Sequence, residues 1–146
     1  MSDILVVYGT ESGNSEMAAD DIAASFSGRG VTAEVKSMED VSVSDLSSVS
    51  QLVVVTSTYG EGELPETSAP FFADLEAEQP DLSGVRFFAF GLGDSTYTKF
   101  NNAIDIMVSK LLELGAVQVG ETGRHDAASG KSVTLVANAW VEQVYN

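Results

Sequence analysis

Six residues near the N-terminus, Thr10-Glu11-Ser12-Gly13-Asn14-Ser15, place hydroxyl side chains and a glycine between an apolar run and a helical pattern. Such a loop can hold a phosphate, because its backbone N–H groups and the positive end of the helix dipole face the ligand. The hydroxyl groups add further donors. The loop contains no lysine or arginine, so dipoles and hydrogen bonds alone would neutralise the anion. The alternative is an ordinary strand-to-helix turn capped by serine or asparagine.

Two further loops follow apolar runs and each carries a tyrosine: Ser57–Pro65 contains Tyr59, and Gly91–Tyr97 ends in Tyr97. If both loops lie beside the first, the two aromatic rings can enclose a flat ring by stacking. Gly93 and Asp94 can then supply polar groups to the edge of that ring. A phosphate, a polar chain and a flat heteroaromatic ring together describe flavin mononucleotide (FMN). For each tyrosine taken alone, the alternative is a loop residue half-packed on the core.

Five segments are predicted to be strands. The apolar runs Ile4–Tyr8, Gln51–Thr56 and Val85–Phe90 are typical of strands that are buried on both faces. Val31–Lys36 alternates apolar and polar side chains, which indicates a strand at the sheet edge, and Ala116–Val119 is predicted to be the last strand.

Helical patterns separate these strands. The first begins at Asn14, carries Ala18, Ile22 and Phe26 on one stripe, and is stopped by the glycines at 28 and 30. The other predicted segments are a helix capped by Thr67 or Ser68 with Pro70 in its first turn, a helix at Asn101–Leu114, a final helix with apolar residues between Val133 and Val144, a loop or short helix at Ser37–Ser50, and a polar loop at Glu121–Ala128.

This order of strands and helices predicts a doubly wound α/β fold, a parallel sheet with helices on both faces, formed by residues 1–146 as one domain. In such sheets the ligand binds outside the carboxyl ends of the strands, at the point where the strand order reverses. The three loops that begin at Thr10, Ser57 and Gly91 all follow strands at that edge. The fold therefore predicts that they form one site.

The net charge of -15 disfavours binding to nucleic acid or to anionic lipid, and favours basic protein partners. The alternative is that the charge only keeps the protein soluble. The chain has no cysteine, which excludes disulfides and thiolate metal sites. No apolar run approaches the ~20 residues of a membrane span, and the N-terminus lacks the pattern of a signal peptide, so we expect a cytoplasmic protein.

The three loops resemble those of flavodoxins, and the similarity to the short-chain members covers nearly the whole sequence. The first loop is similar to the family pattern T/S-x-T/S-G-N-T/S, Thr58-Tyr59-Gly60 to its first aromatic followed by glycine, and Gly91–Tyr97 to its G-x-G-D-S/Q-x-Y loop. The resemblance implies a flavodoxin-like five-stranded sheet of order 2-1-3-4-5 that binds FMN. The FMN-binding residues that it implies are Thr10, Glu11, Ser12, Gly13, Asn14, Ser15, Ser57, Thr58, Tyr59, Gly60, Gly91, Leu92, Gly93, Asp94, Tyr97, Phe100 and Asn101.

The resemblance also implies a role for each loop. The first loop binds the phosphate, and Thr58 lies near the phosphate and the ribityl chain. Tyr59 covers the inner face of the ring and Tyr97 the more exposed face, while Asp94 and the backbone before it meet the pyrimidine edge. Gly60 lies beside the flavin N5, where its peptide can turn so that a carbonyl accepts the N5 proton of the semiquinone; glycine makes that turn at little steric cost.

By the same resemblance, the protein is an electron carrier and not an enzyme. It would receive electrons from an NAD(P)H-dependent flavodoxin or ferredoxin reductase, pass them to acceptors with a basic face, and act as a monomer without nucleic acid or membrane. Glu61, Glu63 and Asp94 would disfavour the anion of reduced flavin, so the protein would cycle mainly between semiquinone and hydroquinone. The alternative is a flavin-dependent NAD(P)H:quinone-type reductase on the same fold.

Several residues depart from the family pattern or lie outside it. Tyr59 replaces the commoner tryptophan, and the loop that follows it also resembles those of diflavin reductases and of MioC-type proteins. The insertion that long-chain flavodoxins carry in the last strand is absent. His125 is the only histidine and is expected to be a solvated loop residue, although an acid–base role is an alternative. Asp126 is a weaker candidate for the site, and no cluster has metal-ligand spacing.

Overall fold

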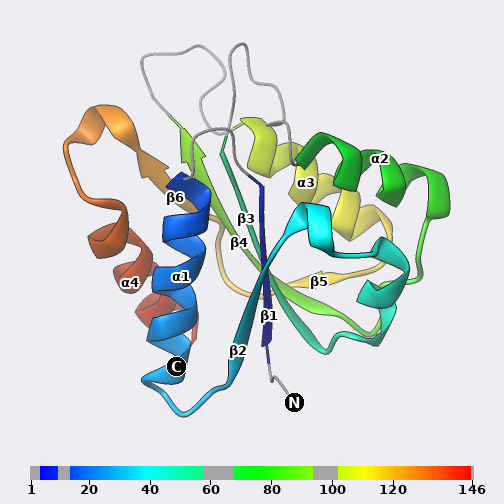
Figure 1. The fold of residues 1–146 in the computed structure, drawn as a ribbon, viewed down its shortest axis with the longest axis horizontal. Helices are drawn as coiled ribbons and strands as arrows, with labels where there is room; N and C mark the ends of the chain where they lie inside the picture. The colour runs from blue at the N-terminus through cyan, green and yellow to red at the C-terminus, as the bar shows by residue number, and fades with distance from the viewer. Residues whose placement is uncertain (1–3, 10–13, 58–67, 94–101, 146) are drawn as a thin grey trace.

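The computed structural model of this protein describes residues 4–9, 14–57, 68–93 and 102–145. Its parallel sheet has the strand order β2-β1-β3-β4-β5 (Figure 1). The sixth strand, β6, also pairs with β4, but with a later part of β4 than β5 does. The strands are β1 (Ile4–Gly9), β2 (Ala33–Ser37), β3 (Gln51–Ser57), β4 (Arg86–Gly93), β5 (Val117–Gln118) and β6 (Gly123–Asp126). The predicted α/β class and the order 2-1-3-4-5 are confirmed.

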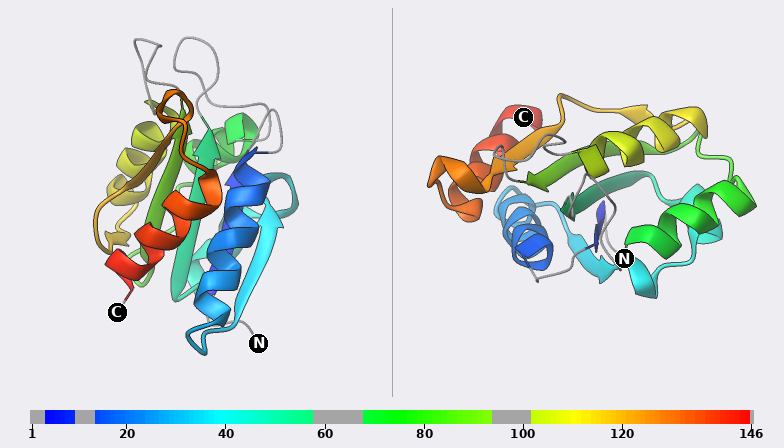
Figure 2. Two further views of the ribbon diagram at one scale, coloured as in Figure 1. Left: turned by 90° about the vertical axis from the view of Figure 1, so that its left-hand side faces the viewer. Right: turned by 90° about the horizontal axis from the view of Figure 1, so that it is seen from above.

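Helices cover both faces of the sheet, so the molecule has three layers (Figure 2). The helices α1 (Asn14–Ser27) and α4 (Val133–Val144) lie on one face, and α2 (Ser68–Glu78) and α3 (Asn102–Glu113) lie on the other. Two short 3₁₀ helices, Met38–Asp40 and Val43–Ser48, stand where a loop or short helix was predicted. The second of them packs Val43 and Leu46 against the core on the side of α2 and α3.

The sheet is the centre of two hydrophobic cores. The four residues Leu52–Val55 of β3 are fully buried and alternate between the cores, because successive side chains of a strand point to opposite faces. On the α1 side, Ala18, Ile22 and Phe26 are fully buried at a spacing of four residues, as their periodicity predicts.

The end of α1 shows how local chemistry stops a helix. Gly30 adopts a left-handed backbone with φ of 82°, and its N–H donates to the carbonyl of Ser27. The N–H of Val31 donates to the carbonyl of Phe26, which completes a Schellman motif. Because glycine adopts this conformation without a Cβ penalty, the chain can turn directly into β2 at the sheet edge. The predicted stop and the predicted edge strand are both confirmed.

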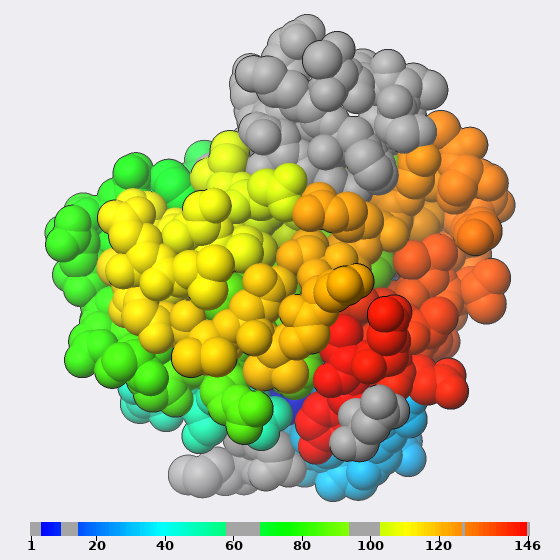
Figure 3. Space-filling model, turned by 180° about the vertical axis from the view of Figure 1, so that it is seen from behind, coloured from blue at the N-terminus to red at the C-terminus, as the bar shows by residue number. Residues whose placement is uncertain are grey.

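The last part of the sheet differs from the prediction. Instead of one strand at Ala116–Val119, the fifth position holds two short strands: β5 pairs with Arg86 and Phe87, and β6 pairs with the last four residues of β4. The predicted polar loop at Glu121–Ala128 is therefore wrong, because it contains β6. The segment from β5 to β6 lies at the molecular surface between α3 and α4 (Figure 3).

Candidate functional site

The carboxyl ends of β1, β3 and β4 lie side by side and in register. Gly9 of β1 is opposite Thr56 of β3, and Thr56 is opposite Gly91 of β4. Neighbouring strands of a sheet are ~4.8 Å apart, so the three segments that follow these strands start within a narrow space. The strand order also reverses here, since β1 connects through α1 to β2 on one side and pairs with β3 on the other. The ends of the three strands thus mark a ligand site of the doubly wound fold.

The N-terminus of α1 presents a buried hydroxyl group beside this edge. Ser15, the second residue of the helix, is fully buried, and its Oγ has no hydrogen-bond partner among the residues that the structure describes. A buried hydroxyl normally has a partner, and the first N–H groups of a helix lack partners within the helix. Together with the helix dipole, these donors fit the phosphate of FMN.

Of the other predicted site residues, Asn14 begins α1 and Ser57 ends β3. Gly91, Leu92 and Gly93 were predicted to belong to a loop, and the structure corrects this: they are the last residues of β4. The physical reason is β6, whose residues 124, 125 and 126 pair with them and extend the hydrogen-bonded ladder. Gly93, the last residue of β4, lies at the same edge of the sheet as the ends of β1 and β3.

The remaining predicted FMN-binding residues lie outside the described residues, and their roles stay predictions. They are Thr10, Glu11, Ser12, Gly13, Thr58, Tyr59, Gly60, Asp94, Tyr97, Phe100 and Asn101. The same holds for Glu61 and Glu63, on which the expected redox behaviour depends.

His125 is not the solvated loop residue that was expected. It lies on β6, is 7% exposed, and its Nε2 is 2.8 Å from the carbonyl oxygen of Lys131. The ring thereby connects β6 to the segment that precedes α4. Asp126 stands opposite Gly93 in the sheet, and its Oδ1 accepts a hydrogen bond from the Ala128 N–H at 2.9 Å. A structural role therefore explains both residues.

Sequence reasoning missed two contacts at the base of the site. The hydroxyl groups of Thr56 and Ser68 are 2.8 Å apart in a fully buried position. Arg124 of β6 forms an ion pair with Asp105 of α3, with 2.6 Å between Nη2 and Oδ1. The first contact joins residues on either side of the segment 58–67, which follows β3, and the second joins β6 to α3. The only sequence signal was a hydroxyl residue at a strand end and another at a helix start.

A further contact joins β1 to α1. The Tyr8 hydroxyl donates a hydrogen bond to Oε2 of Glu16 at 3.2 Å, across the segment 10–13. Partial burial raises the pKa of the Tyr8 phenol above its usual value, and the negative charge of Glu16 raises the pKa further. The neutral phenol is thus favoured in the folded protein.

We expect the Tyr8→Phe variant to differ from the wild type in its response to high pH. A raised pKa in the folded state means that the stabilisation by Tyr8 is complete below about pH 10 and is lost as the pH rises through the folded-state pKa. The difference in unfolding free energy between wild type and variant should therefore shrink above pH 10. Urea denaturation at steps from pH 8 to 11 measures it, and parallel curves would contradict the prediction.

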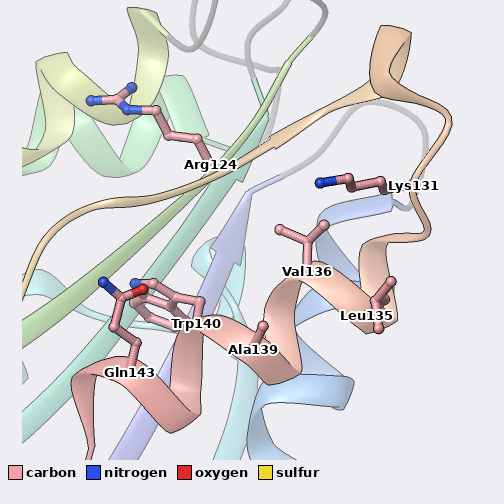
Figure 4. Close-up of a pocket in the computed structure, with 7 residues that line it drawn as sticks. All are labelled: Arg124, Lys131, Leu135, Val136, Ala139, Trp140 and Gln143. Carbon is pink, nitrogen blue, oxygen red and sulfur yellow. The ribbon is translucent and has the colours of Figure 1, made fainter.

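A separate hollow lies beside α4 and is formed by residues of β6, of α4 and of the segment between them. Its lining consists of Arg124, Lys131, Leu135, Val136, Ala139, Trp140 and Gln143 (Figure 4). The Arg124 side chain points away from α4 (Figure 4), toward its ion pair with Asp105. This hollow contains no residue from the ends of β1, β3 or β4, so it is distinct from the site described above.

The part of the chain that the structure describes contains neither a membrane-spanning helix nor a metal-ligand cluster. No helix in that part is both long and apolar enough to cross a membrane. No group of three or more histidine, cysteine, aspartate or glutamate residues there could hold a metal ion.

Comparison with known proteins gives a family match along most of the chain. The model of the family described as flavodoxin matches residues 6–140. The flavodoxin of Maridesulfovibrio salexigens is 40% identical over 129 residues, which cover 86% of this chain and 87% of that protein. Protein MioC of Escherichia coli O157:H7 is 37% identical over 122 residues, which cover 84% of this chain and 82% of that protein.

Much larger relatives and solved structures also match. Mitochondrial pyruvate dehydrogenase [NADP(+)] of Euglena gracilis is 32% identical over 145 residues, but the chain spans only 8% of the length of that protein. The crystal structure of oxidised Flavodoxin 2 from Bacillus cereus superimposes with a TM-score of 0.85 at 30% sequence identity, over 95% of this chain and 94% of that one.

Proposed function

We propose that this protein, which belongs to the flavodoxin family, passes single electrons between a reductase and acceptor enzymes. Flavodoxins are FMN-binding electron carriers, and FMN is the cofactor of this family. The observation that carries the proposal is the fully buried Ser15 hydroxyl at the N-terminus of α1, which has no hydrogen-bond partner among the described residues and lies beside the aligned ends of β1, β3 and β4.

The residues of this chain would hold FMN from three sides. Ser15 and the N–H groups of α1, with the hydroxyl residues of the segment 10–13, would bind the phosphate. Tyr59 and Tyr97 would enclose the ring, and the segment after Gly93 would meet its polar edge. When bound, FMN accepts and donates electrons one at a time. The protein would bind it non-covalently and protect it from solvent.

The charge of the protein favours one part of the redox cycle. The chain carries a net charge of -15, and Glu61, Glu63 and Asp94 belong to the segments predicted to contact the ring. Negative charges disfavour the anion of fully reduced flavin, so the second electron should be harder to add than the first. We therefore propose that the protein cycles mainly between the one-electron-reduced and the fully reduced forms of FMN, as a donor of low potential.

The same charge would select the partners. A strongly acidic carrier docks on proteins that present a basic face, and the long-range attraction increases the association rate. We propose an NAD(P)H-dependent flavodoxin or ferredoxin reductase as the electron source, basic-faced enzymes as acceptors, and a monomer in the cytoplasm as the working form. Residues 1–146 would act as one FMN-binding domain.

A coupled assay tests this function against the alternative, a flavin-dependent NAD(P)H:quinone-type reductase. The FMN-loaded protein should not oxidise NADPH by itself, even with a quinone present. With a flavodoxin reductase and cytochrome c, it should pass electrons at a rate that falls as salt is added, because salt screens charge attraction. Steady NADPH oxidation by the protein alone would support the reductase instead.

A further inference from the structure

The Thr56–Ser68 hydroxyl pair occupies a central place beneath the site. Thr56 is the last but one residue of β3, Ser68 is the first residue of α2, and both side chains are fully buried. Thr56 Oγ1 is 2.8 Å from Ser68 Oγ and donates to the carbonyl oxygen of Ser57 at 3.2 Å. Either hydroxyl group can be the donor in the pair, and each hydroxyl group has one proton to donate. Thr56 thus contacts both Ser68 and the carbonyl group of Ser57, whose peptide bond leads into residue 58.

The end of β1 packs directly against this pair. Gly9 is opposite Thr56 in the sheet, and a Cβ atom added at Gly9 would lie 1.7 Å from Ser68 Oγ and 2.8 Å from Ser68 Cβ. The Sδ atom of Met38 would lie 2.9 Å from it on the same side. Only glycine leaves room for the hydroxyl pair here. The residue after Gly9 begins the loop that is predicted to bind the phosphate.

One buried polar contact therefore lies at the base of two predicted FMN-binding segments. The segment 58–67 begins two residues after Thr56 and ends just before Ser68, so the hydrogen bond holds its two ends together. The segment 10–13 directly follows Gly9, which packs against Ser68 of the same pair.

We propose that the Thr56–Ser68 pair is a positioning element of the FMN site, which sets FMN affinity and the separation of the two one-electron potentials. This inference rests on the proposed function, because it assumes that the segment 58–67 contacts the flavin ring. If the pair served stability alone, its removal would not change FMN affinity or the potentials in a variant that is as stable as the wild type. Replacing both members of a buried hydrogen bond by apolar groups of similar shape is often nearly neutral for folding, so such a variant separates positioning from stability.

The test compares four variants with the wild type: Thr56→Val, Ser68→Ala, the double variant, and Thr56→Ser, which keeps the hydroxyl group. Each single apolar change leaves the other hydroxyl buried without its partner and should lower the stability of the apoprotein. The double variant should unfold at nearly the wild-type urea concentration. Its FMN dissociation constant should nevertheless rise about tenfold, which is the effect of losing one net hydrogen bond from the positioned state.

The two one-electron reduction potentials of bound FMN distinguish positioning from stability, because a contact that serves only stability would not change them. We expect the separation between the two one-electron potentials to narrow in the double variant by about 59 mV, equivalent to a tenfold change for a one-electron step. Thr56→Ser should keep the wild-type affinity and separation. The matched control is Ser42→Ala with Ser44→Ala, which removes an exposed hydroxyl pair 2.9 Å apart and should change neither value.

Two results would overturn the proposal. The first is a double variant with the wild-type dissociation constant and the wild-type separation of potentials. The second is a Thr56→Ser variant as impaired as Thr56→Val, since the hydroxyl group would then be irrelevant. If the wild type itself took up no FMN, the proposed function would fail, so the two failures are distinguishable.

Discussion

The Ser15→Ala variant should bind FMN about 10- to 100-fold more weakly than the wild type, because a hydrogen bond to a charged group contributes ~1.5–3 kcal/mol. The apoprotein should be as stable as the wild type or more stable. The Ser15 hydroxyl is fully buried without a partner among the described residues, and alanine removes an unsatisfied group while it also favours the helix. Opposite effects on binding and on stability would identify a group that is kept for its ligand.

Riboflavin makes this experiment specific for the phosphate. It has the ring and the ribityl chain of FMN but no phosphate, so Ser15→Ala should leave its dissociation constant unchanged. Flavin fluorescence quenching measures both ligands, and urea denaturation measures the apoprotein. Ser27→Ala, at the exposed C-terminal end of the same helix, is the matched control. Equal losses for FMN and riboflavin would place Ser15 away from the phosphate.

A second large effect is expected at Gly123, the first residue of β6. A Cβ atom there would lie 2.5 Å from Cδ1 of Phe90 and 2.6 Å from Cδ1 of Trp140. Phe90 is fully buried and Trp140 is nearly so, and their ring centroids are 5.2 Å apart in the core between the sheet and α4. Gly123→Ala should therefore destabilise the protein by about 1–3 kcal/mol, the usual cost of overpacking a core.

The control for this variant is Gly84→Ala, because a Cβ atom at Gly84 would meet nothing within 4 Å and the backbone there is not left-handed. Urea denaturation of the two apoproteins gives the comparison. A Trp140→Leu change, which removes one of the contacted rings, should reduce the additional cost of Gly123→Ala in the double variant. Equal stability of the two glycine variants would show that β6 does not pack as the structure describes.

The regular elements could be predicted because their residues follow simple periods. Continuous apolar runs predict β1, β3 and β4, and the spacing of Ala18, Ile22 and Phe26 predicts α1. β6 could not be found in this way. Its sequence, Gly-Arg-His-Asp, has no apolar side chain, and its inward positions are a glycine and a histidine. Tertiary pairing with β4, rather than local preference, makes it a strand.

The sequence also predicts which strand ends form the candidate site, but it does not predict the contacts at the base of that site. Loops that follow buried parallel strands meet at one edge, so the sequence alone predicts a phosphate site that includes Ser15. The Thr56–Ser68 contact joins residues that are 12 positions apart in the chain, and only the fold brings them together. His125 was expected in solvent because a polar segment surrounds it, whereas β6 turns its side chain inward.

The measurement that tests the central claim most directly is stepwise reduction of the FMN-loaded protein with dithionite, followed by absorption spectroscopy. A one-electron carrier predicts that the oxidised flavin bands decline first while a long-wavelength band of neutral, one-electron-reduced FMN grows, and that this band disappears only on further reduction. Bleaching of the bound flavin in a single two-electron step would contradict this account and favour a reductase. A protein that fails to take up FMN would contradict both.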